Sequence, residues 1–255
     1  MLCNLTYPQD KYDETNLDKR LIVQLINKHR KYVLPQLKKN KEYYDGKHAI
    51  LSKKREKDAP NAKTVCNHAK DITDTASGYF MGNPITYENT GKNSIDTLIQ
   101  AFDVAEVDDT DNDNALMQSI YGVAYDYTYA AEGKAELMTR NLESENTFLV
   151  YDDSIEQKEL FGVYYYVKKN SATSEEKYIA TVCTENLTYN FNLSTDYSES
   201  QELSMDEVPD SHNLGECPIT EYKNNKFNIG DFEQQIGLID AYNMLMADRV
   251  NDKEQ

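Results

Sequence analysis

The chain has 255 residues and a formal net charge of −17. This length is enough for one large domain or two small ones with a buried core. So acidic a composition argues against proteins that wrap nucleic acid tightly, because attraction between cationic side chains and phosphates dominates that kind of affinity.

The charge is unevenly distributed along the chain. The first 70 residues hold 16 Lys and Arg against 8 Asp and Glu, a balance of +8, so the remainder carries −25. A polar, loose start is expected before a helix that Thr15 or Asn16 caps. Pro35 interrupts or kinks this helix, and a second one stops at Gly46. The basic quarter therefore begins with an amphipathic helical arm.

A basic stretch follows the helical arm. Residues 47–63 are rich in Lys and Arg and poor in apolar side chains, which predicts an exposed loop. Such a loop either grips an acidic partner, a neighbouring subunit or DNA, or is an ordinary solvated loop. Asn67 then caps a helix, which the strong stop signal Gly82-Asn83-Pro84 ends.

An acidic cluster occupies residues 106–113. Its aspartates have the spacing of a calcium loop, but Asn114 replaces the required glycine and Ile120 stands in the place of the bidentate glutamate. Metal binding is therefore not expected. The cluster is interpreted as the charged N-terminus of a helix that continues through Val123 and Tyr127 at helical spacing.

The second half of the chain changes character after Gly133. Short segments rich in β-branched and aromatic residues alternate with polar turns, which predicts an antiparallel meander. These segments are 135–142, 147–151, 160–168, 178–184 and 187–193. A further short strand is expected at 85–87, and residues 194–214 predict an acidic loop. The fold class is therefore α+β, with N-terminal helices, a central helical region, the meander and a C-terminal helix.

The last stretch predicts a short extended run, a turn at Asn224-Asn225 and a helix that starts after Gly230. Asp231 is the expected N-cap, and apolar residues follow at helical spacing. No Gly, Asn or Pro stop signal follows at the helix end. This pattern is interpreted as a helix cut in mid-course, so the chain is expected to be the front part of a longer one.

The sequence contains no recognisable catalytic or cofactor motif. It lacks H-E-x-x-H, G-x-x-x-x-G-K-[ST], G-x-G-x-x-G and G-x-S-x-G, and its four cysteines form no C-x-x-C pair. No apolar run approaches the roughly 20 residues that span a bilayer. We therefore expect no catalytic residue, no cofactor, no metal and no membrane contact. A carbohydrate-active enzyme that uses two of the many carboxylates stays open as an alternative.

Several short stretches occur together in an order typical of one family. They are Tyr43–Gly46; Asn67 with Ala69 and Ile72, running into GYFMGNPI at 78–85; GVAY at 122–125; PI at 218–219 with EYKNN at 221–225; GDFE at 230–233; DAYN at 240–243; and Asp248. In this order, the sequence resembles the portal proteins of tailed bacteriophages, of the type found in long-tailed phages of Gram-positive hosts. The resemblance covers roughly residues 41–252.

The resemblance implies a structural subunit without catalysis of its own. Such a subunit forms a ring, usually of twelve copies, at one vertex of the virion head, and assembles in the host cytoplasm. The ring is the conduit for DNA packaging and ejection. Its implied partners are other portal subunits, the major capsid and scaffold proteins, the packaging terminase, the head-completion adaptor and double-stranded DNA, which passes without sequence-specific binding.

The resemblance also implies a division of the chain. Residues 1–46 form a helical arm, 47–132 the mainly helical part of the wing, 133–229 its β part, and 230–255 the start of the stem helix. The clip, channel loop and crown would follow, so no residue that contacts DNA is assigned, and a chain without a complete stem is expected to be monomeric. The motif residues with an implied structural role are Gly78, Gly82, Asn83, Pro84, Asn224, Asn225, Gly230 and Asp231.

Three acidic residues of the expected stem helix are candidates for the channel lining or a subunit interface. They are Glu233, Asp240 and Asp248. If they face the lumen, a ring of copies repels phosphates and lets a duplex slide; alternatively, they only keep the helix soluble. A different class of function also stays open, an acidic DNA-mimicking module that occupies a nucleic-acid-binding partner.

Overall fold

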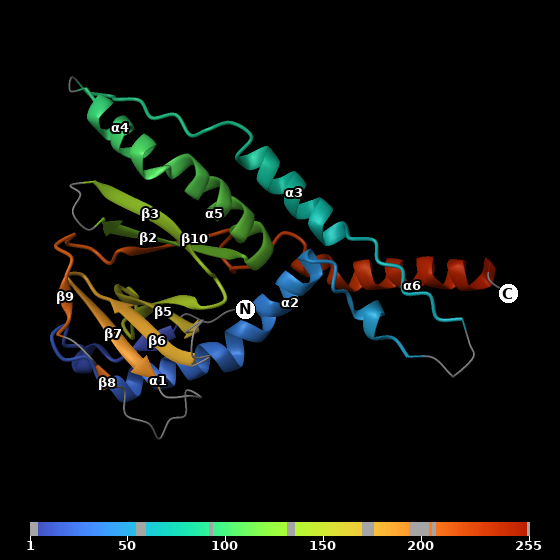
Figure 1. The fold of residues 1–255 in the computed structure, drawn as a ribbon, viewed down its shortest axis with the longest axis horizontal. Helices are drawn as coiled ribbons and strands as arrows, with labels where there is room; N and C mark the ends of the chain where they lie inside the picture. The colour runs from blue at the N-terminus through green and yellow to red at the C-terminus, as the bar shows by residue number, and fades with distance from the viewer. Residues whose placement is uncertain are drawn as a thin grey trace.

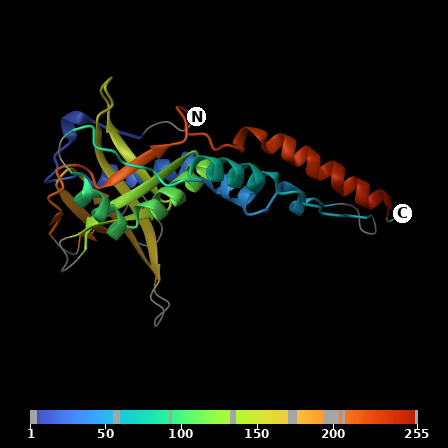
Figure 2. The ribbon, with the colours of Figure 1, turned by 90° about the horizontal axis from the view of Figure 1, so that it is seen from above.

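Two sheets lie face to face at the centre of the molecule, and helices cover the outer face of each (Figure 1). A computed structural model of the chain describes residues 5–54, 60–91, 94–131, 136–169, 176–193, 204–205 and 208–253. We call these four layers the body. One helix, α6 (Ile236–Lys253), extends away from the body to the side (Figure 2). The fold is α+β, as the sequence predicted.

The larger sheet has the order β1-β4-β5-β6-β7-β8, and β9 pairs with β7. The antiparallel run from β4 to β7 confirms most of the predicted meander. The strands of this sheet are β1 (Leu5–Tyr7), β4 (Thr147–Asp152), β5 (Glu159–Lys169), β6 (Glu176–Cys183), β7 (Leu187–Leu193), β8 (Ser204–Met205) and β9 (Asp210–Ser211).

The expected loose start of the chain is wrong, because β1 pairs in parallel with β4. The Tyr7 side chain is fully buried, and its ring meets the edge of Phe161 with the centroids 5.5 Å apart. Burying one aromatic ring contributes roughly 2 kcal/mol, and together with the pairing to β4 it holds these three residues at the sheet edge.

The smaller sheet has the order β10-β2-β3 and is antiparallel. Its strands are β2 (Val123–Ala130), β3 (Leu137–Leu142) and β10 (Ile219–Lys223). The predicted helix through Val123 and Tyr127 is therefore wrong beyond Tyr121. Gly122 adopts φ +83°, a left-handed conformation that ends the helix and lets β2 begin.

A polar cluster ties the two sheets together across their interface. Tyr125 on β2 and Tyr151 on β4 each donate a hydrogen bond to Glu221 on β10, at 2.9 and 2.7 Å. Gly162 of β5 lets the sheets approach, because a Cβ there would lie 2.9 Å from the Ile219 side chain. The apolar residues around this contact are Val123, Leu149, Cys183 and Ile219.

Helix α1 (Lys19–Lys28) covers the larger sheet with its apolar face. Its N-cap is Asp18, whose carboxylate accepts from the Arg20 amide at 2.9 Å, and the predicted cap at Thr15 or Asn16 is wrong. The reason is local, since Asp13 accepts from the backbone and hydroxyl of Thr15 in a turn before the helix.

The interruption expected at Pro35 takes the form of a π-helical turn, His29–Val33, between α1 and α2 (Leu34–Tyr44). Proline has no amide hydrogen, so the regular ladder cannot continue through it without such an adjustment. Helix α2 then stops before Gly46, which has φ +77°, as predicted.

Helices α4 (Asp96–Ala105) and α5 (Val107–Tyr121) cover the smaller sheet, and α3 (His68–Phe80) packs against α5 on the side toward α6. The Asn67 side chain caps α3 as predicted, accepting from the Lys70 amide at 3.2 Å. The acidic cluster begins α5, also as predicted. Residues 85–87 form no strand, contrary to expectation, and none of the strands in the described ranges pairs with them.

Two predicted loops fall partly outside the described residues, at 55–59 and at 194–203 with 206–207. The described part of the basic stretch 47–63 contains a short 3-10 helix, Ala49–Ser52, and His48 is buried rather than exposed.

Candidate functional site: the junction that seats α6

The loop between β10 and α6 holds its shape through two asparagine side chains. The carboxamide oxygen of Asn225 accepts from the amides of Phe227 and Ile229 at 3.0 and 3.2 Å. The Asn224 amide group donates to the Ile229 carbonyl at 3.0 Å and to the Asp231 carboxylate at 2.9 Å. These bonds confirm the predicted turn and make it a rigid support for the helix that follows.

This loop is seated on the C-terminal end of α5. The Asp231 amide donates to the Ser119 carbonyl at 2.8 Å, and the Ser119 hydroxyl donates to the Asp231 carboxylate at 2.7 Å. A Cβ on Gly230 would lie 2.5 Å from the Ile120 carbonyl oxygen, and one on Gly122 would lie 2.3 Å from the Asn228 carbonyl oxygen. Only glycine fits at both points of contact.

The predicted N-cap role of Asp231 is therefore wrong, because its carboxylate is bonded to Ser119 and Asn224. A 3-10 turn, Glu233–Gln235, precedes α6 instead. Helix α6 then packs Ile236 and Ile239 against α2 and α3, in a cluster with Tyr43, Ala69 and Phe232.

The three acidic candidates all contact groups of their own chain. Glu233 accepts from the Asn40 amide group at 2.8 Å, and both carboxylate oxygens of Asp240 lie 2.9 Å from the Tyr43 hydroxyl. Burial, with the Asp240 contact, raises the pKa of Tyr43 to about 12. Asp248 lies 3.6 Å from the Lys53 ammonium, and 45% of its side chain stays exposed. The first two therefore hold α6 to α2, and Asp248 alone combines an ion pair with substantial exposure.

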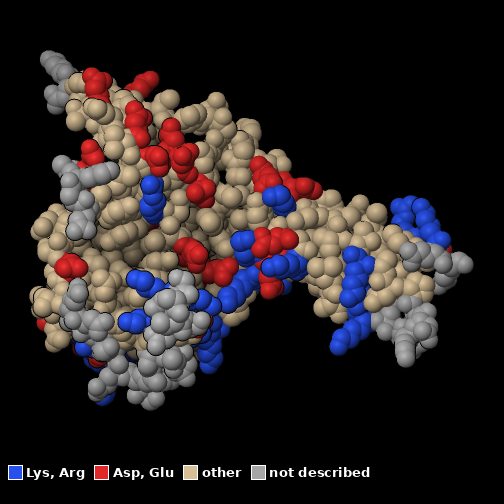
Figure 3. Space-filling view, in the orientation of Figure 1, with Lys and Arg blue, Asp and Glu red and all other residues tan. Residues whose placement is uncertain are grey.

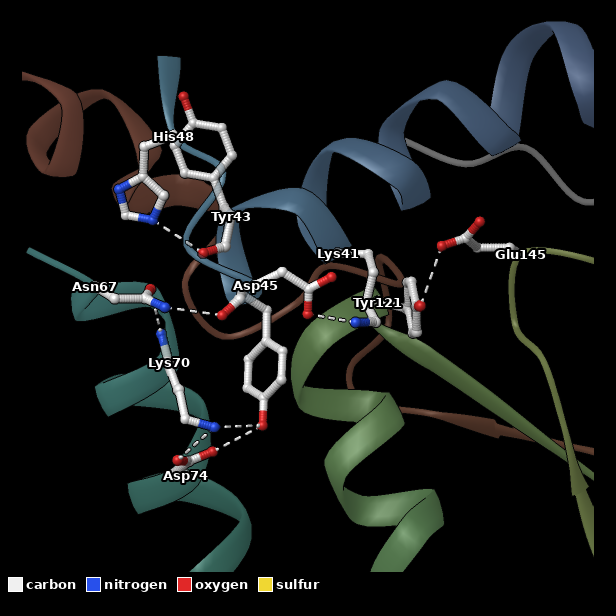
Figure 4. A network of polar contacts seen from close by, with 10 residues as sticks. Lys41, Tyr43, Asp45, His48, Asn67, Lys70, Asp74, Tyr121 and Glu145 are labelled. Carbon is white, nitrogen blue, oxygen red and sulfur yellow. Dashed lines mark hydrogen bonds and ion pairs between the residues drawn. The ribbon is translucent and has the colours of Figure 1, made fainter. Parts of the chain in front are cut away.

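A buried His-Asn pair fixes the next turn of α6. The Cys66 amide donates to the Asn243 carboxamide oxygen at 2.8 Å, so the amide nitrogen of Asn243 faces His48 Nδ1 at 2.7 Å. His48 Nδ1 is then an acceptor, and Nε2 carries the proton toward the Tyr43 carbonyl at 2.9 Å. The His48 ring also stacks on Tyr43, with centroids 4.8 Å apart (Figure 4).

An extended segment, residues 60–67, runs beside α6 as a strap. The Asn251 carboxamide oxygen accepts from the Ala62 amide at 2.8 Å, just as the Asn243 oxygen accepts from the Cys66 amide at the other end of the strap. Ala247 lies between these asparagines at helical spacing and is fully buried. The two asparagines accept hydrogen bonds from the strap backbone, and the small Ala247 side chain leaves room for the strap to lie close to α6.

A second polar network joins α2 to α3 next to the junction (Figure 4). The Asn67 amide group donates to the Tyr44 carbonyl at 2.9 Å, so the residue that caps α3 also binds the end of α2. The Tyr44 hydroxyl lies 3.1 Å from Asp74 and 3.2 Å from the Lys70 ammonium. Helices α2, α3 and α6 therefore meet at one braced corner.

The structure separates the motif residues into two places. Asn224, Asn225, Gly230 and Asp231 lie together in the junction, while the stretch from Gly78 to Pro84 lies at the far end of α3. A Cβ on Gly82 would lie 2.5 Å from the Gly78 carbonyl oxygen, so the chain needs glycine to turn out of α3.

The described ranges contain no group of three or more His, Cys, Asp or Glu side chains placed to hold a metal ion. None of the helices in those ranges has the length and hydropathy that crossing a bilayer requires. Burial raises the pKa of Cys183 to about 12 and also raises that of Cys217, so neither thiol is a ready nucleophile at neutral pH.

The family model described as "Phage portal protein, SPP1 Gp6-like" matches residues 23–255. The chain belongs to this family of phage portal proteins. No curated protein matches the sequence. The portal family is structural rather than enzymatic, and it implies an oligomeric ring in the virion head. A structural protein family is expected to have a site that fixes the position of an element rather than one that performs chemistry. The corner that holds α6 is a site of this kind.

The sequence patterns indicated no specific role for His48, Asn243 or Asn251 in this portal protein. A signal was present, since two asparagines eight residues apart flank an alanine on a helix with many apolar residues. Polar residues at buried helical positions demand specific partners. The partner could not be identified, because the strap lies about 180 residues away in the sequence.

Replacing Asn243 with alanine in the portal protein should lower the free energy of unfolding by about 3 kcal/mol. The change leaves His48 Nδ1 and the Cys66 amide without their buried partner. Urea unfolding measures the loss, and hydrogen exchange should show faster opening of α6. Met244→Ala is the control, because Met244 is half-exposed on the same helix. Equal stability of the two variants would show that the pair does not hold α6.

Proposed function

We propose that this chain is the ring-forming subunit of a phage head vertex, that residues 230–255 begin the stem around the channel, and that residues 1–229 form the wing. The ring is the conduit for DNA during packaging and ejection, and the platform for the packaging terminase, the head-completion adaptor, and contacts with capsid and scaffold. The observation that carries the proposal is α6, which buries one face on its own chain and leaves the other uncovered.

The uncovered face of α6 is apolar. Leu238 and Leu245 are 68% and 65% exposed, and Tyr242 and Met244 are also exposed. Leu238, Tyr242 and Leu245 recur at helical spacing on the side away from Ile239, Asn243 and Ala247. An apolar stripe of this kind on a projecting helix usually marks a contact surface. In a ring-forming family, the occupant is a second copy of the chain.

The charged candidates have separate roles in this proposal. Glu233 and Asp240 keep α6 at its angle to the body through Asn40 and Tyr43. Asp248, further along the helix and with 45% of its side chain exposed, is the one proposed to face the lumen or a neighbouring subunit. Family membership favours this structural role over the alternative of an acidic DNA mimic.

Replacing Leu238 and Leu245 with aspartate in the full-length protein should abolish ring formation while leaving the fold intact. Two charges on the stripe would have to be desolvated at each contact. Light scattering and electron microscopy measure the assembly, and circular dichroism checks the fold. The control is Ile155→Asp with Val208→Asp, because both are fully or largely exposed on loops of the body. Rings that form normally from the α6 variant would refute the proposed interface.

A further inference from the structure

Two segments of the chain have opposite and unmixed charge. Residues 19–41, which include α1 and most of α2, hold eight Lys and Arg and no Asp or Glu, and Glu42 follows in the last turn of α2. Residues 94–121, which include α4 and α5, hold seven Asp and Glu and no Lys or Arg. Such segregation is unfavourable within one molecule, because like charges repel along each helical layer.

Helix α1 lies on the opposite side of the body from α4 and α5, whereas α2 packs its Leu37 against Ile120 and Tyr121 of α5. Helix α1 covers the outer face of the larger sheet, and α4 and α5 cover that of the smaller sheet (Figure 1). In the space-filling view, Asp and Glu side chains gather along the edge over α4 and α5, and Lys and Arg side chains gather lower down, near α2 (Figure 3). The body therefore has a basic face and an acidic face.

The charged side chains on both faces are available to a partner. Lys28, Lys31, Lys38 and Lys39 are exposed on the basic face, and Asp103, Asp108, Asp109 and Asp113 on the acidic face. Arg140 of β3 approaches the acidic face and lies 3.4 Å from Glu106. The negative charge of the acidic face is therefore only partly offset by cationic groups of the same chain.

The helical layer on the acidic side also exposes large apolar side chains. Tyr79 and Phe80 at the end of α3 are 92% and 70% exposed, and Leu98 on α4 is half-exposed. On the basic side, Tyr32 is 67% exposed among the lysines. Aromatic and aliphatic residues bordered by charge are typical of contact surfaces rather than of free solvent-facing helices.

We propose that neighbouring copies of this chain pack the basic face of α1–α2 against the acidic face of α4–α5. Each face repels a copy of itself, so a two-fold pairing of like faces is disfavoured, whereas unlike faces attract. A contact between two different faces repeats from copy to copy and closes into a ring when the rotation allows. This inference rests on the proposed ring and names a second interface for it, separate from α6.

Charge reversal tests this interface in the full-length protein. One variant carries Lys31→Glu and Lys38→Glu, and the other carries Asp103→Lys and Asp109→Lys. In each variant, one face takes on charge of the same sign as the face that it would contact. The protein concentration needed for half-assembly should therefore rise at least about tenfold. An equimolar mixture of the two should assemble again, because every contact in an alternating ring then pairs complementary faces.

The control variant carries Lys168→Glu and Lys177→Glu, which face each other across β5 and β6 and lie outside both faces. It should assemble like the unmodified protein. Light scattering measures assembly, and thermal melting checks that each variant folds. Unchanged assembly of the reversed variants, or a mixture no better than its components, would overturn this interface while the ring itself stands. Failure of the unmodified protein to form rings would overturn the proposed function as well.

Discussion

Replacing Gly122 with alanine should lower the free energy of unfolding by more than about 3 kcal/mol. Gly122 has φ +83°, and an added Cβ would lie 2.3 Å from the Asn228 carbonyl oxygen. The methyl group cannot move away, because both partners are backbone atoms and Asn224 is bonded to the Gly122 carbonyl. The expected result is a much lower midpoint of urea unfolding, and loss of ring assembly at temperatures where the variant still folds.

Gly215→Ala is the matched control for this experiment. Gly215 has a similar left-handed conformation, φ +77°, but nothing lies within 4 Å of an added Cβ. The backbone strain alone should cost about 1 kcal/mol. The difference between the two variants therefore measures the close approach of the α6 loop to the end of α5. Equal losses would show that the junction is not tightly seated.

Acidification should destabilise the protein through His29. Burial lowers the pKa of this imidazole to about 3, from 6.5 in an exposed chain. The unfolded chain binds the proton below about pH 6.5 and the folded chain does not, so this stabilising contribution is complete above that pH and lost as the pH falls toward 3. Between about pH 7 and about pH 4, His29 should account for a loss of about 3 kcal/mol.

His29→Gln isolates this effect. The His29 ring stacks on Phe148 at 4.8 Å, and its Nδ1 lies 2.9 Å from the Tyr165 hydroxyl. Glutamine keeps a polar group toward Tyr165 and cannot titrate, so the variant should be less stable at neutral pH and lose much less on acidification. His68→Gln, at a half-exposed ring on α3, is the control. An unchanged acid dependence in the His29 variant would show that other groups control it.

The sequence predicted the elements whose local signals agree. Asn67 caps α3 and the Gly-Asn-Pro stretch ends it, because capping chemistry acts over a few residues. The run from β4 to β7 was predicted since alternation and polar turns coincide there. Strand β2 was missed, because Val123 and Tyr127 also fit helical spacing and the left-handed Gly122 decides between the two patterns.

The junction was predictable only in part. The resemblance to portal proteins pointed to Asn224, Asn225, Gly230 and Asp231, and the structure shows why such residues occur together there. It could not supply the pairing of Asn243 with His48 or the strap along α6, because those contacts join segments far apart in the chain. Long-range polar contacts depend on the assembled fold, which a local pattern does not encode.

In the proposed assembly, the junction between β10 and α6 directs α6 toward the axis of the ring. Electron cryomicroscopy of the assembled full-length protein tests this arrangement. The expected result is a closed ring in which residues 236–253 surround the central channel, with the loop 224–231 seated on α5. A ring with α6 on its outer surface, or a particle in which α6 folds back onto its own body, would contradict it.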